Sequence, residues 1–397
     1  MNKKILILGG GQAQIGLIKT AKEKGMKVIV VGIHGDYPGY LLADKVYFED
    51  IFNKDAVLKV AKEEKVDGIS MVCSDFGLPT VGYVCDHMHL QGLSEKVAIN
   101  SSNKMKMKQM MQEAGVNTAK FRIVRNDDEI NDAINALAFP LIVKAVDLQG
   151  SRGIYICNSP SELLNNYRKS IKESRKDYCI VEEFIEGEEF GAQAFVYHGE
   201  VLFVQTHGDI VRKEGNTSIP IGHYMPLFDK EDRRDEIVTD LVKKAISALH
   251  FDNCAVNVDL IMKGNVPYII ELTGRAGANF LPELTGTYLG LNYYEMVLSC
   301  AVGESPKDYY NQRGNGASCV LTRQLYSTNS GLVKKLYIRP NSQIKNVEMF
   351  LSEGDKVNKF SNSNDSIGKV LCIGKNIEEC MNTMESFIEN DLHIEIE

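Results

Sequence analysis

The sequence has no pair of cysteines in CxxC spacing, although nine cysteines are scattered over its 397 residues. That scatter favours reduced thiols over a disulfide framework or a zinc site. No block of basic residues interrupts the formal net charge of −8, which argues against an electrostatic affinity for nucleic acid. No apolar run is long enough to span a bilayer. These absences predict a cytoplasmic protein that acts on small molecules and binds neither nucleic acid nor a membrane.

The N-terminal part has the alternating order of a parallel α/β sheet. The expected elements are a strand at Lys4–Leu8, a glycine turn, a helix at Gln14–Lys24, a strand at Lys27–Val31, a helix at Lys54–Glu64 and a strand at Gly68–Cys73. This order predicts a doubly wound sheet. The glycines of the turn lack the full dinucleotide spacing, because Gly9, Gly11 and Gly16 do not form GxGxxG, and this disfavours NAD binding.

The remainder of the chain has an α+β pattern with hairpins. A helix at Ser102–Ala114 ends at Gly115 and leads into strands at Pro140–Val146, Cys179–Phe184, Gly191–Tyr197 and Val201–Thr206, with helices at Pro160–Glu173 and Lys230–Leu249. Beyond Val302, short strands at Ala317–Leu325 and Lys369–Ile373 precede a helix at Ile377–Asn390. We therefore expect three domains: 1–115, 116–302 and a small α+β domain at 303–397.

The most informative segment is Ala255–Arg275, AVNVDLIMKGNVPYIIELTGR. Two β-rich runs flank a Lys-Gly-Asn turn, so a hairpin would set Asp259 nearly opposite Glu271. Alternation divides the hairpin into two faces. The expected polar face holds Asn257, Asp259, Glu271 and Thr273, and the expected core face holds Val256, Val258, Leu260, Ile270 and Leu272. A half-solvated hairpin is the alternative interpretation.

Two other segments have the residues of a nucleotide site. Lys144 ends an apolar strand and precedes a loop, 147–153, that contains Ser151, Arg152 and Gly153; a hydroxyl, backbone N–H groups and two cations there suit phosphate oxygens. The segment Cys179–Phe190, CIVEEFIEGEEF, joins a buried strand to a carboxylate-rich turn. Such an edge offers backbone groups and apolar walls for adenine and a carboxylate for ribose.

Together these motifs resemble the ATP-grasp superfamily over essentially the whole chain. The resemblance rests on Lys104 after an α/β domain, Lys144 with its loop, the EExIxGxE strand and the acidic hairpin that closes with ExTxR. It implies a pre-ATP-grasp domain, an ATP-grasp domain of two α+β subdomains and a C-terminal α+β domain. It also makes a homodimer a reasonable expectation.

The resemblance implies a role for each matching residue. Lys104 and Lys144 would bind phosphates, and the loop over the triphosphate would contain Ser151, Arg152 and Gly153. Adenine would be recognised by Glu182, Glu183, Phe184 and Ile185. Glu189 would bind ribose. Asp259 and Glu271 would hold Mg²⁺, or Mn²⁺, with Glu271 bridging two ions. Arg275 would stabilise the transferring phosphoryl group and, with Lys144, serve catalysis. Thr273 replaces the usual asparagine, so a hydroxyl stands where a side-chain amide oxygen would complete the metal shell.

Such a site implies phosphoryl transfer from ATP to a carboxylate and attack on the acyl phosphate by an amine. The segments SIPIGHYMP (218–226) and GANFLPEL (277–284) are similar to those of relatives that join amino acids. His223 is a candidate for binding a substrate carboxylate or relaying a proton, and Asn279 lies in the same expected pocket; a histidine bonded at a strand edge is the plain alternative. A purine-pathway or biotin-carboxylase relative and an inert ATP-binding protein are the competing interpretations.

Overall fold

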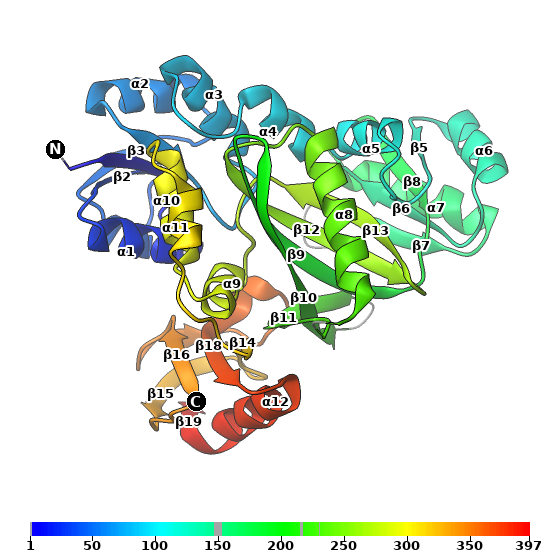
Figure 1. Cartoon of the computed structure of the whole chain (residues 1–397). Coiled ribbons are helices and arrows are strands. Elements are labelled where there is room, and N and C mark those ends of the chain that lie inside the picture. The colour runs from blue at the N-terminus through cyan, green and yellow to red at the C-terminus, as the bar shows by residue number, and fades with distance from the viewer. Residues whose placement is uncertain (1, 147–152, 215–216, 230) are drawn as a thin grey trace.

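The computed structural model describes residues 2–146, 153–214, 217–229 and 231–397. An N-terminal parallel sheet, a small antiparallel sheet and a long central sheet are packed together with their helices (Figure 1). The mixed α/β and α+β class predicted from the sequence is confirmed. Among the described helices, none combines the length and apolarity needed to cross a membrane.

The N-terminal sheet is parallel and covered by helices on both faces, as the doubly wound prediction requires. Its strands are β1 (Lys4–Leu8), β2 (Lys27–Gly32), β3 (Lys45–Phe48) and β4 (Gly68–Ser70), in the order β3-β2-β1-β4. The first helices are α1 (Ile15–Glu23), α2 (Lys54–Glu64), α3 (Leu78–Met88) and α4 (Glu95–Ser102), with 3₁₀ turns at Gln12–Gln14 and Pro38–Leu41. The strand expected at Gly68–Cys73 ends at Ser70, and α3 and α4 were not predicted.

Burial on both faces explains why β1 is apolar throughout. Ile5 and Ile7 pack with α1 and with α10 (Tyr293–Ala301) on one face, whereas Leu6 and Leu8 pack with α2 and α3 on the other. Continuous apolar strands are typical of parallel sheets that are covered twice. Helix α10 thus lies against the N-terminal sheet although it is far away in sequence (Figure 1).

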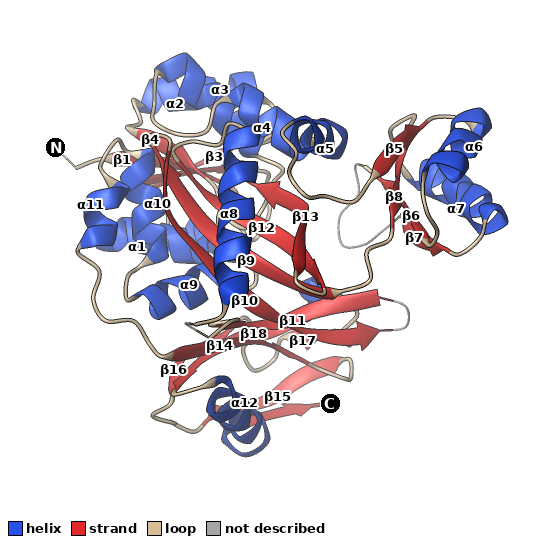
Figure 2. Ribbon diagram, turned by 45° about the vertical axis from the view of Figure 1, so that its right-hand side comes forward, coloured by secondary structure: helices blue, strands red, loops and turns tan. Residues whose placement is uncertain are grey.

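A small antiparallel sheet carries one half of the expected nucleotide site. It comprises β5 (Phe121–Val124), β6 (Leu141–Ala145), β7 (Ile154–Cys157) and β8 (Cys179–Glu183), in the order β5-β8-β6-β7. The helices α6 (Asp127–Ala136) and α7 (Pro160–Glu173) accompany it (Figure 2). Leu141, Val143 and Val181 face the core beneath these helices. The alternate residues Lys144 and Glu182 therefore lie on the opposite face.

The central sheet has eight strands in the order β13-β12-β9-β10-β11-β14-β18-β16. Their bounds are β9 (Glu188–Tyr197), β10 (Glu200–Glu214), β11 (Thr217–Met225), β12 (Cys254–Lys263), β13 (Val266–Thr273), β14 (Cys319–Tyr326), β16 (Ile344–Met349) and β18 (Ser366–Gly374). Helices α5 (Lys104–Glu113) and α8 (Arg233–Ala248) cover one face, where Met107, Val242 and Val258 share a core. The other face carries the polar residues of the site.

The C-terminal region continues this central sheet, because β14, β18 and β16 are three of its strands. A separate three-stranded sheet is formed by β15 (Gly331–Ile338), β17 (Lys356–Val357) and β19 (Leu392–Ile396). The remaining helices are α9 (Leu281–Leu289), α11 (Pro306–Asn311) and α12 (Ile377–Ser386). A 3₁₀ turn at Ser363–Asp365 precedes β18, and a π-helical turn at Phe387–Asp391 follows α12. The domain boundaries at residues 115 and 302 remain predictions.

Candidate functional site

The hairpin β12–β13 has the predicted pairing around its acidic residues. Asp259 pairs with Glu271, and Asn257 pairs with Thr273. The register shifts after Asp259, where Leu260 pairs with Ile269. Ile270 is thus an extra residue in β13, and Ile269 is the one buried in the core, at 1% exposure. The placement of Ile270 on the core face was wrong, because a bulge breaks strict alternation.

The two hairpin carboxylates share one half-buried environment. Burial, followed by the charge of Glu271, raises the pKa of Asp259 to about 7. Burial would also raise the pKa of Glu271, but the charges of Lys104 and Lys144 bring it below its ordinary value. Two carboxylates on adjacent strands with unequal proton affinities are a suitable pair of ligands for a hard divalent cation. Buried Thr273 Oγ1 beside them has no hydrogen-bond partner among the described residues.

Lys104 closes one side of this carboxylate pair. It is the first residue of α5, whose N-terminus is capped by the Asn103 side chain accepting from Lys106 N at 3.1 Å. Its Nζ donates a hydrogen bond to Glu271 Oε2. Burial acts to lower the pKa of Lys104, but the negative charge of Glu271 outweighs burial and raises it. Lys104 is therefore a stable cation beside the hairpin.

Lys144 and Lys108 share the carboxylate of Glu182 on the small sheet. Glu182 Oε2 lies 3.1 Å from Lys144 Nζ and 3.2 Å from Lys108 Nζ. Burial would raise the pKa of Glu182, but the two lysine charges lower it. Burial lowers the pKa of Lys108. Lys108 Nζ also donates a hydrogen bond to Thr118 Oγ1 at 2.9 Å. Sequence reasoning missed Lys108; its spacing of four residues from Lys104 on one helix was the available signal.

A chain of side-chain amides extends from Asp259 into the adjacent strand. Asn257 Nδ2 donates to Asp259 Oδ1 at 3.2 Å, and Gln193 Nε2 donates to Asn257 Oδ1 at 2.6 Å. Gly277 N in turn donates to Gln193 Oε1 at 2.9 Å. Gln193 is fully buried. These bonds orient Asp259 and tie the segment after Arg275 to the hairpin.

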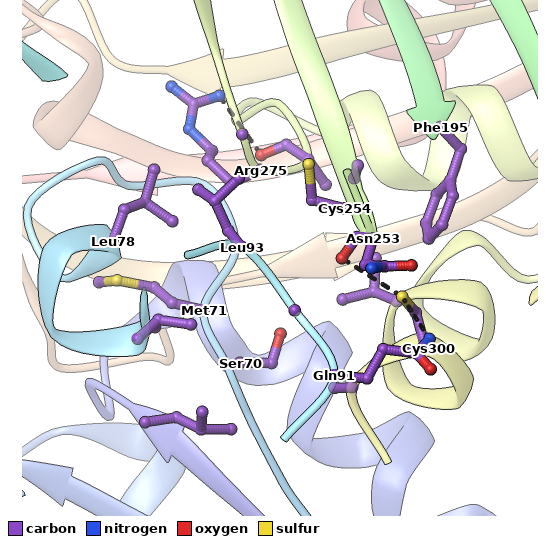
Figure 3. Close-up of a pocket in the computed structure, with 18 residues that line it drawn as sticks. Ser70, Met71, Leu78, Gln91, Leu93, Phe195, Asn253, Cys254, Arg275 and Cys300 are labelled. Carbon is purple, nitrogen blue, oxygen red and sulfur yellow. Dashed lines mark hydrogen bonds between the residues drawn. The ribbon is translucent and has the colours of Figure 1, made fainter. Parts of the chain in front are cut away.

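Arg275 lies where the loop after β4 of the N-terminal sheet meets the hairpin. Its Nε donates to Asp75 Oδ1 at 2.7 Å. Burial would lower the pKa of Arg275, but the charge of Asp75 raises it. Cys73 N donates to Ala276 O at 3.0 Å, so the loop after β4 is bonded directly to this segment. A small cavity of about 50 Å³ lies behind Arg275, between β4 and residues 253–255 (Figure 3). Ligand pockets are commonly about 300–1,000 Å³, so this cavity is too small for a nucleotide.

His223 belongs to a cluster that the sequence did not reveal. His223 Nδ1 lies 2.6 Å from Asp209 Oδ1, and His207 Nδ1 lies 3.0 Å from the same oxygen. Burial would raise the pKa of Asp209, but its hydrogen bonds with the two histidines bring it well below its ordinary value. Burial lowers the pKa of His207. The only signal in the sequence was the alternation of His207 and Asp209 along one strand.

The other predicted nucleotide residues are spread around the small sheet. Gly153 O accepts hydrogen bonds from Ala145 N at 2.9 Å and Ser170 Oγ at 2.6 Å. Glu183 Oε1 accepts from Ala138 N at 3.1 Å, on the face opposite Glu182. Phe184 N donates to Pro140 O at 2.9 Å, and Ile185 follows it, half-buried. Glu189 is exposed and pairs with Ile261, which places it on the same sheet face as Asp259. Ser151 and Arg152 lie outside the described residues.

Asn279 and Phe280 follow the arginine in an unusual backbone conformation. Both residues have positive φ, at 53° and 72°, which is rare for non-glycine residues and is concentrated at functional sites. Helix α9 begins directly after them. The predicted substrate segment 277–284 therefore contains a strained turn beside Arg275.

Known proteins match this chain in both sequence and fold. The sequence model of the phosphoribosylglycinamide synthetase ATP-grasp (A) domain matches residues 102–279. The crystal structure of phosphoribosylglycinamide synthetase from Anaerococcus prevotii is 40% identical in sequence, covers all of both chains and has a TM-score of 0.89. The chain belongs to the ATP-grasp family. An L-amino acid ligase from Bacillus licheniformis shares the same fold, with 22% identity, coverage of 100% and 99%, and a TM-score of 0.82.

More distant ATP-grasp relatives differ in length. A formate-dependent phosphoribosylglycinamide formyltransferase from Bacteroides fragilis is 24% identical over 94% of each chain. The carbamoyl phosphate synthase large chain from Clostridium acetobutylicum is 21% identical over 88% of this chain, but this covers only 33% of the relative. The chain thus spans about a third of the length of such large chains.

Proposed function

We propose that this ATP-grasp protein is an ATP-dependent carboxylate–amine ligase that forms an amide or peptide bond and releases ADP and phosphate. One observation carries the proposal: the acidic pair Asp259 and Glu271 lies on one sheet face with Lys104 bonded to it and within the electrostatic influence of Lys144 and Arg275. A site that had to hold only a nucleotide would not need an arginine at the phosphoryl end. Positioned cations of this kind stabilise charge on a transferring phosphoryl group.

The nucleotide would lie between the small sheet and the hairpin. Lys104 and Lys144 would bind its phosphates beneath the loop with Ser151, Arg152 and Gly153. The segment Glu182–Ile185 would receive adenine, with buried Glu182 holding Lys144 in place and the backbone of Phe184 and Ile185 forming the edge. Glu189 would bind ribose. Lys108 adds a second buried cation to this side.

Asp259 and Glu271 would hold Mg²⁺ or Mn²⁺. The two carboxylates lie opposite each other on adjacent strands, and the unbonded Thr273 Oγ1 is available as a further oxygen ligand. These oxygen donors fit a hard cation. When bound, the ion would neutralise phosphate charge and help to orient the nucleotide.

The residues around the pair account for the remaining chemistry. Lys144 and Arg275 would offset the charge that develops as a substrate carboxylate captures the terminal phosphoryl group. The resulting acyl phosphate would be attacked at carbon by an amine. Asp75 fixes Arg275 for this purpose through the 2.7 Å hydrogen bond.

The proposed substrates are amino acids or amino-acid-like metabolites. The test is ADP release by the purified protein with Mg²⁺ and paired amino acids. Stimulation that requires both members of a pair is expected. ATP binding by calorimetry without any substrate-dependent ADP would instead support an inert nucleotide-binding protein.

A second candidate follows from the 40% identity to the Anaerococcus prevotii phosphoribosylglycinamide synthetase. In that case glycine would supply the carboxylate and phosphoribosylamine the amine. Turnover with this pair, and with no pair of amino acids, would favour the purine-pathway function. We also propose that the protein is a cytoplasmic homodimer. Light scattering after gel filtration tests its oligomeric state.

A further inference from the structure

The site face of the central sheet carries a buried cluster that the phosphoryl-transfer chemistry does not use. We call His207, Asp209 and His223 the histidine cluster. The three side chains lie on neighbouring strands β10 and β11, where Asp209 pairs with His223. The two rings are perpendicular, with centroids 5.2 Å apart. The side chains of His207 and His223 are 3% and 5% exposed and that of Asp209 is 19% exposed, so both rings are buried and the carboxylate is half-buried.

The hydrogen bonds of the cluster fix where its protons lie. Both Nδ1 atoms contact the same Asp209 oxygen, at 3.0 and 2.6 Å. An ionised carboxylate only accepts, so each Nδ1 must carry the donated proton. In the neutral form of an imidazole bonded in this way, Nε2 is unprotonated. Both Nε2 atoms are buried without a partner in the described part of the chain, and leaving a buried acceptor without a hydrogen bond is unfavourable.

The cluster lies close to the acidic hairpin β12–β13. His207 pairs with Gly191 on β9, and Gly191 pairs with Asp259 on β12. A Cβ at residue 191 would lie 2.4 Å from His207 Nε2, so the ring occupies the space that glycine leaves free. Strands are about 4.8 Å apart, which places His207 roughly 10 Å from the β12 backbone at Asp259. The strand order β12-β9-β10-β11 can be followed in Figure 2.

The chemistry of the cluster selects the kind of group it can bind. It combines one carboxylate with two unprotonated nitrogen acceptors, and its own N–H donors are already used by Asp209. A phosphate or carboxylate would find no free donor there. An ammonium group offers three donors and a positive charge, which match two bare acceptors and the nearby anion.

We propose that the histidine cluster binds the ammonium group of the amine substrate through the Nε2 atoms of His207 and His223, and that Asp209 holds both rings. This assignment rests on the proposed ligase function. An imidazole Nε2 takes one proton from the ammonium group. The freed amine lone pair forms the bond to the acyl carbon, the carbon–oxygen bond to phosphate breaks, and the departing phosphate takes the second proton.

A metal ion is the other cation that bare imidazoles attract. The three side chains can each offer a ligand atom, all within 4.8 Å of one another. Nitrogen and oxygen ligands lie about 2.0–2.2 Å from zinc, and a separation of 2.6 Å between two of them is too short for the wide angles of a tetrahedral site. The observed separation between His223 Nδ1 and Asp209 Oδ1 is 2.6 Å and matches a hydrogen bond. The geometry therefore favours an ammonium ligand, and metal binding becomes an outcome of the test.

The experiment separates the two half-reactions. Hydroxylamine, which is mostly uncharged at neutral pH, traps the acyl phosphate as a hydroxamate and reports the first half-reaction. Amide formation from the amine substrate reports the second. His207→Asn and His223→Asn retain a donor toward Asp209 but lack the Nε2 acceptor. His87→Asn on the exposed face of α3 is the matched control.

Each cluster variant is expected to raise the KM for the amine about tenfold to a hundredfold, because it removes one hydrogen bond to a charged group. Hydroxamate formation and the KM for ATP should change far less, and the control should resemble the unmodified protein. Gly191→Ala, which pushes the His207 ring aside, should reproduce the amine effect if an asparagine variant fails to fold.

Three results would overturn the assignment. The first is equal loss in both half-reactions, which would place the cluster in phosphoryl transfer. The second is an unchanged KM for the amine. The third is a stoichiometric metal ion, detected by mass spectrometry in the purified protein and lost in both variants. If the unmodified protein forms no hydroxamate with any acid, the ligase function itself fails, which is a distinguishable result.

Discussion

Asp75 and Arg275 are 200 residues apart in the sequence and are joined by a 2.7 Å hydrogen bond from Nε to Oδ1. Asp75 lies in the loop after the last strand of the N-terminal sheet, and Arg275 lies two residues past the end of β13. The Arg275 side chain is half-buried, with 12% exposed. The loop after β4 thus sets the orientation of the arginine that we assign to phosphoryl transfer.

Replacing Asp75 should therefore impair catalysis more than nucleotide binding. Asp75→Asn retains an oxygen for Arg275 but removes the charge that holds the guanidinium. We expect kcat to fall by about tenfold, because one charge-assisted hydrogen bond is worth about 1.5–3 kcal/mol, with little change in the KM for ATP. Steady-state kinetics with ATP as the varied substrate measures both constants. Asp128→Asn on the exposed surface of α6 is the control, and an equal rise in the KM for ATP would contradict this account.

The acidic pair should make the stability of the metal-free protein depend on pH. The pKa of Asp259 is about 7 in the folded protein, against an ordinary value of 3.8. Because the folded state binds this proton more tightly, the free energy of unfolding should fall as the pH rises from 3.8 to about 7 and then level off. Asp259→Asn should remove this part of the slope. Urea denaturation at several pH values measures it.

Magnesium provides the check on that prediction. An ion between the carboxylates favours their charged forms, so Mg²⁺ should raise the stability of the unmodified protein near neutral pH and have much less effect on Asp259→Asn. An identical response of the two proteins to Mg²⁺ would show that Asp259 is not a metal ligand.

Removing Glu182 should destabilise the small sheet and weaken ATP binding. Glu182→Gln leaves Lys108 and Lys144 without their shared counter-charge in a buried place. Loss of one partner from a buried ion pair costs about 3–5 kcal/mol. Thermal and urea denaturation measure this loss, and calorimetry with ATP measures binding. For the stability measurement, Glu183→Gln is the neighbouring control, since in the described part of the chain the Glu183 carboxylate contacts Lys120 at 3.8 Å and Ala138 N; a similar loss of stability there would mean that the strand, not the pair, is responsible.

Thr273 offers a test of the metal site with little structural disturbance. Its buried Oγ1 has no hydrogen-bond partner in the part of the chain that the structure describes. Thr273→Val therefore loses no hydrogen bond in the ligand-free protein, and its free energy of unfolding should change by less than about 1 kcal/mol. If the hydroxyl contacts the ion, the Mg²⁺ concentration required for half-maximal ADP release should rise. Unchanged Mg²⁺ dependence would remove Thr273 from the ligand set.

The sequence predicted the elements of the fold well where the pattern was local. Helix α2 and helix α7 begin and end at the predicted residues, and the pairing of Asp259 with Glu271 followed from alternation across a recognisable turn. The pattern failed where the backbone departed from regularity. The bulge at Ile270 and the short β4 are examples, because one extra or turning residue changes which side chain faces the core.

By itself, the sequence determined the parallel N-terminal sheet, the acidic hairpin and the family resemblance, because each depends on periodicity or on spacing along the chain. Only the tertiary structure decided that Lys108 joins Lys144 at Glu182, that Asp75 holds Arg275, and that two histidines share Asp209. These contacts join residues from different elements or distant segments. Their geometry depends on how the sheets pack and in which register the strands pair, and no local pattern in the chain encodes it.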